Sequence, residues 1–260
     1  MASVSELILQ RQQHNQDVLI GYFPAGFPTV ADSVEACVAM CKAGVDVLEL
    51  GVPYSDPVMD GLVIQEATET ALANGFKLRQ LFDAVKEITS QVDTPVLIMS
   101  YWNPIIQFGV RKFAEEVKNS GAKGIITPDL IPDEATEWIT ISDELELDRV
   151  FLATPSSSPE RLAAAAKASR GFVYAVSTMG ITGAREDLDA KARAVVSGVK
   201  ATQSQTPVCV GIGISTAAQV REVNSYSDGA IVGSALIKAY NQGGVQELVS
   251  CVKELKAGAQ

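Results

Sequence analysis

Short apolar runs alternate along this chain with segments whose apolar residues recur three or four positions apart. The runs suit buried β-strands and cover residues 18–23, 45–50, 95–100, 124–127, 150–153, 172–175, 208–211 and 230–232. The segments between them have a helical period, as in Val34-Val38-Cys41, Leu81-Val85-Ile88 and Leu248-Val252-Leu255. Alternating strands and helices predict a parallel sheet. Eight repeats predict its closure into a (β/α)8 TIM barrel, an α/β fold.

The ends and connections of these units fit one domain. Residues 1–16 are polar around the apolar patch Leu7-Ile8-Leu9, which predicts an extra N-terminal helix rather than a signal peptide. We interpret residues 154–159 as a strand-to-helix loop, with Ser157 or Ser158 capping a helix that Pro159 begins. Since we find no long linker, we predict a single TIM-barrel domain over residues 1–260.

Composition narrows the classes of partner. The formal net charge of −10 disfavours nucleic acid and acidic membranes, although local backbone N–H groups can still hold a small anion. The four cysteines show no CxxC spacing, and the single histidine, His14, is far from Cys37 and Cys41 in the sequence. We therefore expect reduced thiols in a cytoplasmic protein and no metal site.

Two carboxylates stand out in the segment from Glu49 to Gly61. Glu49 ends an apolar strand, where barrel enzymes keep catalytic groups, and Asp60 lies in the loop that follows. A single loop carboxylate is usually only solvated. Glu49 is different, because an ionisable group that continues an apolar strand must be paired, protonated or at the strand's solvent end. Together the two acids indicate proton-transfer chemistry.

Glycines mark the loops after the last three strands. Residues 211–215 and 233–235 each begin with glycine and are expected to lead directly into helix N-termini, the usual phosphate site of a barrel. The sixth loop, residues 176–185, contains Gly180 and Gly183 and suggests a mobile lid that carries Thr182 toward a carboxylate. An ordinary flexible connection remains an alternative for that loop.

These motifs, in this order and spacing over nearly the whole chain, resemble tryptophan synthase alpha chains. The resemblance implies a carbon–carbon lyase that cleaves indole-3-glycerol phosphate to indole and D-glyceraldehyde 3-phosphate in tryptophan biosynthesis. Schiff-base or metal-dependent aldol chemistry is less consistent with the residues. Lys123 precedes its strand, and no ligand cluster is evident.

The resemblance also implies roles for individual residues. Glu49 would exchange protons with the substrate, Asp60 would accept the indole N–H, and Tyr174 would lie near Glu49. Thr182 would be the lid residue. The remaining site residues would be Gly183, Gly213, Gly233 and Ser234 at the phosphate, with Tyr22, Ile64, Met99 and Ile212 around the indole.

Family members act with a beta chain that uses pyridoxal phosphate, so the resemblance implies an alpha2beta2 heterotetramer and no cofactor in this chain. Pro53, Asp56 and Asn103 match positions on the partner-facing rim; without the resemblance they are ordinary loop residues. A stand-alone indole-releasing lyase, another phosphate-binding barrel enzyme and a non-catalytic activator of a beta chain remain alternatives.

A few positions depart from the family pattern. Leu62 and Val63 replace the usual Pro and Thr after Asp60-Gly61, which removes a residue that would fix a helix start and a hydroxyl near the site. Thr178 replaces a common Arg, and Tyr22 replaces a common Phe. We interpret these changes as tuning of the pocket.

Overall fold

The computed structural model describes residues 3–176, 185–211 and 213–259. All hydrogen-bonded strand pairs within its single sheet are parallel. The strands are β1 (Leu19–Pro24), β2 (Val47–Gly51), β3 (Val96–Met99), β4 (Gly124–Ile126), β5 (Asp148–Val150), β6 (Leu152–Ala153), β7 (Val173–Val176), β8 (Val208–Gly211) and β9 (Gly229–Val232).

The sheet closes into a barrel at Phe151. The strand order is β5-β4-β3-β2-β1-β9-β8-β7-β6, so the two strands at its ends are neighbours in the chain. The single strand predicted over residues 150–153 is therefore divided: Val150 pairs with Ile126 in β4, and Leu152 pairs with Tyr174 in β7. At Phe151 the backbone N–H instead donates to the Ser169 hydroxyl, 3.2 Å away. With this correction, the predicted TIM barrel is confirmed.

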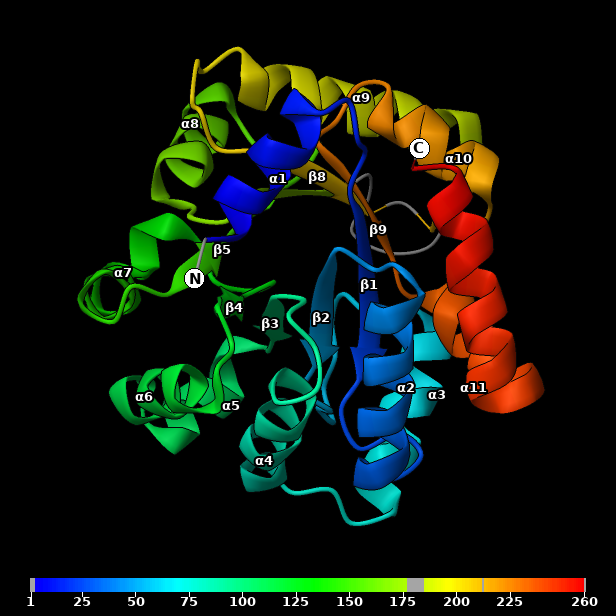
Figure 1. The fold of residues 1–260 in the computed structure, drawn as a ribbon. Helices are drawn as coiled ribbons and strands as arrows, with labels where there is room; N and C mark the ends of the chain where they lie inside the picture. Colours follow the sequence, from blue (N-terminus) through cyan, green and yellow to red (C-terminus); the bar gives the residue numbers. More distant parts are fainter. Residues whose placement is uncertain (1–2, 177–184, 212, 260) are drawn as a thin grey trace.

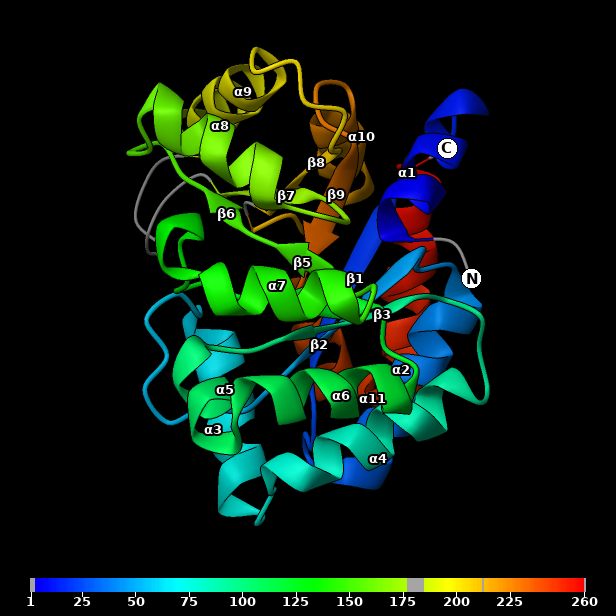
Figure 2. The ribbon, with the colours of Figure 1, turned by 90° about the vertical axis from the view of Figure 1, so that its left-hand side faces the viewer.

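Helices surround the sheet, as Figures 1 and 2 show. They are α1 (Val4–Gln13), α2 (Val30–Ala43), α3 (Leu62–Ala73), α4 (Leu78–Thr89), α5 (Trp102–Phe108), α6 (Val110–Ser120), the 3-10 helix η1 (Pro132–Glu134), α7 (Thr136–Glu144), α8 (Pro159–Ala168), α9 (Arg185–Lys200), α10 (Ala217–Asn224) and α11 (Ser234–Ala257). Among the described residues, none of these helices is long and apolar enough to cross a membrane.

Local sequence signals set several helix ends. Ser158 caps α8 by accepting the N–H of Arg161, as predicted, and Pro159 is its first residue. Gly44 ends α2 with φ of 124°, a conformation that side-chain-bearing residues rarely adopt. Thr216 forms a capping box with Gln219, so α10 begins there. The turn that ends at Ser215 therefore leads directly into the N-cap of α10, as the sequence predicts.

The strands separate two hydrophobic clusters because successive side chains point to opposite faces. Leu48 and Leu50 pack outward with the helices, whereas Ile20, Val47 and Leu97 fill the barrel interior. The predicted N-terminal helix is confirmed as α1. Its buried side chains Val4 and Ile8 belong to the inner cluster, so α1 covers one end of the barrel.

Polar contacts hold α1 in place. The Val4 N–H donates to the buried Asp148 carboxylate at 2.9 Å, and Arg11 lies 3.1 Å from the buried Asp46 carboxylate. Both aspartates lie at or just before the start of a strand. The opposite end of the barrel, where the strands end, is left for the site.

Candidate active site

Glu49 points into the barrel. It follows Val47 by two positions on β2 and so shares the inward face, pairing in register with Tyr22 on β1 and Leu97 on β3. Its side chain is fully buried, and neither carboxylate oxygen has a hydrogen-bond partner among the described residues. Ionising a buried carboxyl group that has no hydrogen-bond partners costs free energy. Burial therefore favours the protonated form of Glu49, which can donate its proton.

Asp60 reaches the same region from the loop between β2 and α3. Its backbone carbonyl accepts a 2.7 Å hydrogen bond from Gln65 Nε2 on the first turn of α3. Its charge acts on the two buried groups Glu49 and Tyr22, whose pKa values it raises. The structure therefore brings together the two carboxylates that the sequence singled out.

The two acids have different pKa values. Burial, and then the negative charge of Asp60, raises the pKa of Glu49 from 4.5 to about 8. Burial also raises the pKa of Asp60, but a hydrogen bond from Tyr101 limits the increase, which takes it from 3.8 to about 6. Between those values one carboxyl group is protonated and the other ionised. This is the division of roles that acid–base catalysis requires.

Two tyrosines line the space around Glu49. Burial raises the pKa of Tyr22 and of Tyr174 well above the ordinary value, and the negative charges of Glu49 and Asp60 add to both increases. Glycine opposite each ring makes room for it. A Cβ atom on Gly51 would overlap the Tyr22 ring, and one on Gly211 would lie 2.6 Å from the Tyr174 hydroxyl. Tyr174 thus lies within electrostatic reach of Glu49, the place that the family resemblance implies for it.

The predicted indole-binding side chains lie mostly in this region. A Cβ atom on Gly233 would lie 3.3 Å from the Tyr22 ring and 3.6 Å from Ile64, which places the glycine beside both side chains. Met99 is partly exposed at the end of β3 and packs against the inner cluster. Ile212 lies outside the described residues. Their role in binding indole stays a prediction.

Three of the four predicted phosphate-binding residues, Gly213, Gly233 and Ser234, lie after the last two strands. Gly233 is the N-cap of α11 and Ser234 its first residue, so unpaired backbone N–H groups are available there. Gly213 is exposed and has φ of 69°, in the left-handed region that favours glycine. Thr182, Gly183 and the departure Thr178 lie outside the described residues, so phosphate binding and the lid stay predictions.

Sequence reasoning missed Tyr101. This residue lies at the start of α5 and is 4% exposed. Its hydroxyl group accepts the N–H of Met59, the residue before Asp60, at 2.9 Å. Its position just past the end of β3 was a usable signal, because catalytic residues of barrels gather there.

The predicted partner-facing rim is only partly exposed in the chain. Asp56 and Asn103 are exposed, whereas Pro53 is buried. Asn103 Nδ2 donates to the Tyr54 hydroxyl at 3.0 Å, which joins the loops after β2 and β3.

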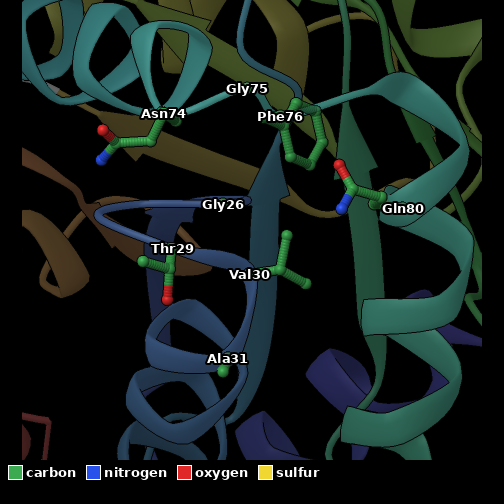
Figure 3. A pocket seen from close by; sticks show the side chains of 9 residues that line it. Gly26, Thr29, Val30, Ala31, Asn74, Gly75, Phe76 and Gln80 are labelled. Carbon is green, nitrogen blue, oxygen red and sulfur yellow. The ribbon is translucent and has the colours of Figure 1, made fainter.

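A separate pocket of about 310 Å³ lies away from the two carboxylates, between the first turn of α2 and the α3–α4 connection (Figure 3). Its lining includes no acidic or basic side chain and consists of Gly26, Thr29, Val30, Ala31, Ala71, Asn74, Gly75, Phe76 and Gln80. We assign no chemistry to it. Within the described ranges there is also no group of three or more His, Cys, Asp or Glu side chains that could hold a metal ion.

Comparison with known proteins identifies the family. Residues 8–260 match the family model described as tryptophan synthase alpha chain. The chain belongs to the tryptophan synthase alpha chain family. The predicted resemblance is thereby confirmed, and with it the prediction of a carbon–carbon lyase of tryptophan biosynthesis that has a beta chain as its partner.

Relatives and solved structures agree over the full length of the family domain. The alpha chain of Leifsonia xyli subsp. xyli is 56% identical over 259 residues, covering 100% of this chain and 99% of the relative. That of Mycobacterium marinum is 50% identical over 95% of this chain and 90% of the relative. The aminoacrylate-bound structure of tryptophan synthase from M. tuberculosis superposes with a TM-score of 0.92 at 44% identity, covering 100% of both chains. The tryptophan synthase complex from Pyrococcus furiosus gives 0.82 at 36% identity, over 92% of this chain and 98% of that one.

The departures from the alpha chain pattern at α3 are visible in the structure. Leu62 is the first residue of α3 and 67% exposed, and the N-cap Gly61 provides no side-chain hydrogen bond. Val63 packs against the outer cluster. The first turn of α3 therefore begins without a proline or a side-chain cap to restrain it.

Proposed function

We propose that Glu49 carries both proton transfers in the cleavage of indole-3-glycerol phosphate by this chain. The carrying observation is its fully buried carboxyl group, without hydrogen-bond partners among the described residues, at the open end of the barrel. The protonated carboxyl donates to indole C3, which converts the ring to a cationic indolenine. The carboxylate then takes the proton of the adjacent side-chain hydroxyl. The C3–carbon bond breaks, its electrons return to the ring, and the hydroxyl carbon becomes the aldehyde of D-glyceraldehyde 3-phosphate.

Asp60 has the complementary task. Its pKa of about 6 leaves it ionised at neutral pH, so it can accept the indole N–H and stabilise the positive charge that develops on the ring. Tyr22, Ile64 and Met99 supply apolar surface for the ring, and the N–H groups at Gly233 and Ser234 hold the phosphate together with the glycine turn at Gly213. We extend the proposal by family likeness to Gly183 and Ile212, and to Thr182 as lid residue.

The pH dependence of kcat/KM tests this division of roles, because kcat/KM reports the pKa values of the free enzyme. We expect a bell-shaped profile with an acid limb near pH 6, where Asp60 becomes protonated, and an alkaline limb near pH 8, where Glu49 loses its proton. The two limbs belong to the coupled pair. Because the substrate's phosphate also titrates near the acid limb, the profile should be repeated with Asp60→Asn. If the acid limb comes from Asp60, it disappears in that variant; if it persists unchanged, the assignment is wrong.

Exposed apolar side chains support docking of the beta chain at the open end of the barrel. Val58, Leu62, Ile106 and Ile131 are 40–72% exposed and follow three neighbouring strands, β2, β3 and β4. Large exposed apolar groups gathered on one face are typical of interaction sites. We propose that these side chains, together with Pro53, Asp56 and Asn103, form the surface that contacts the beta chain in an alpha2beta2 assembly.

Indole release from indole-3-glycerol phosphate by the purified chain, with and without a beta chain, tests the proposal as a whole. Slow release alone that becomes faster with the partner supports it. Fast release alone and no response to the partner would indicate a stand-alone lyase. No release in either condition would indicate another substrate or a non-catalytic activator.

Three further expectations belong to the proposal. The chain acts as a single domain, supported by an outer cluster that includes residues from Leu19 to Ala259. It needs no cofactor of its own, because proton transfer by Glu49 and charge stabilisation by Asp60 suffice for the cleavage, and pyridoxal phosphate acts in the beta chain. It works in the cytoplasm, as its reduced cysteines suggest.

A further inference from the structure

Asp60 lies at the end of a loop with few restraints of its own. Ser55, Asp56 and Val58 are exposed. Among the described residues, Met59 is the only one from 53 to 60 whose backbone N–H makes a hydrogen bond, and its acceptor is the Tyr101 hydroxyl at 2.9 Å. A carboxylate that must meet one substrate atom needs a firmer support than an exposed loop supplies.

Tyr101, by contrast, is firmly held. The preceding residue, Ser100, donates its N–H to Ile126 O at 3.0 Å, and the following residue, Trp102, donates its N–H to Asp129 Oδ1 at 2.8 Å. The Tyr101 ring packs beside Tyr54, with ring centroids 5.4 Å apart and planes tilted by 33°. The ring is thus fixed by β3, β4 and the start of the Asp60 loop itself.

The chemistry of the hydroxyl group completes the link. A phenol that accepts one N–H keeps its own proton to donate. The Tyr101 hydroxyl accepts the Met59 N–H at 2.9 Å, which holds the backbone one residue before Asp60, and the same hydroxyl lies close enough to the Asp60 carboxylate to lower its pKa. On the other side, Gln65 holds only the Asp60 carbonyl.

We propose that Tyr101 is a positioning residue for the lyase reaction. Its buried phenol orients the Asp60 carboxylate toward the indole N–H and keeps that carboxylate ionised. The proposal rests on the function assigned to Asp60 above. In this role the hydroxyl group of Tyr101 positions Asp60, whereas the ring contributes to the apolar wall of the site.

Tyr101→Phe tests it, because this variant removes the hydroxyl group and keeps the ring. We expect kcat to fall about tenfold, in line with loss of a hydrogen bond to a charged group. We also expect the acid limb of the kcat/KM profile to move to higher pH, because the removed hydroxyl group favoured the ionised form of Asp60. Tyr226→Phe is the matched control. It removes a tyrosine hydroxyl that donates to another aspartate, Asp189, at 2.9 Å, and should leave kcat and the acid limb unchanged.

A second measurement does not depend on turnover. In the chain labelled with 13C at the aspartate carboxyl carbons, the Asp60 signal can be assigned by its loss in Asp60→Asn. The Asp60 pKa should be higher in Tyr101→Phe than in the wild type and unchanged in Tyr226→Phe. This outcome would support the positioning role even if another substrate were found.

Two results would overturn the proposal. One is an unaltered Asp60 titration in a folded Tyr101→Phe chain. The other comes from the double variant: if Tyr101→Phe reduces kcat as much in the Asp60→Asn background as in the wild type, the hydroxyl does not act through Asp60. Should Tyr101→Phe fail to fold, Tyr101→Trp provides an alternative that also lacks the hydroxyl, with the same expected rise of the Asp60 pKa.

Discussion

Glu49→Gln should lower kcat for indole release by about a thousandfold, the range typical of a lost general acid–base. Gln has nearly the same shape as Glu but can neither donate a proton to indole C3 nor take one from the substrate hydroxyl. The binding residues remain, so KM should change much less. The measurement is steady-state indole formation with a beta chain present at saturation. Glu87→Gln, on the exposed surface of α4, is the control and should keep wild-type activity.

The same variant tests the burial of Glu49 through stability. Because the pKa of Glu49 is raised from 4.5 to about 8 by folding, the folded chain holds a proton that the unfolded chain has released between those values. The contribution of Glu49 to stability is therefore fully present below about pH 4.5 and is lost as the pH rises to about 8. In Glu49→Gln this decrease of stability with rising pH should be absent. Its free energy of unfolding, from urea titrations at several pH values, should fall less steeply with pH; equal slopes would mean that Glu49 is not buried as an acid.

Asp60→Asn should lower kcat about a hundredfold, which is typical when one electrostatic contact to the developing charge is removed. An amide oxygen can still accept the indole N–H but lacks the negative charge that stabilises the indolenine. The effect should thus fall mainly on kcat, measured by single-turnover indole formation.

Asp83→Asn controls for loss of one negative charge, because Asp83 is exposed on α4. A similar decrease in both variants would point to the overall field of this acidic chain rather than to Asp60. Wild-type activity of Asp60→Asn would contradict its assigned role, and Glu49 would then act without an electrostatic partner.

Sequence patterns predicted the repeated architecture correctly because they depend on local periodicity. Apolar residues three or four positions apart mark helices, and short apolar runs mark buried strands, so the order of the units can be read along the chain. Helix ends such as Gly44 and Ser158 were predictable for the same reason, since capping uses residues within one turn. Substrate identity was not accessible in this way, because an apolar pocket does not name its ligand; it came from the family resemblance.

Sequence by itself therefore determined the eight-unit barrel, the place of Glu49 at a strand end and the pair of acids in one segment. Only the tertiary structure decided where the barrel closes, at Phe151, and that Tyr101 supports the loop of Asp60 from 41 residues away in the chain. It also decided the raised pKa values of Glu49 and Asp60. The physical reason is that strand direction and capping depend on neighbours in the chain, whereas closure, burial and electrostatic coupling depend on groups that meet only after folding.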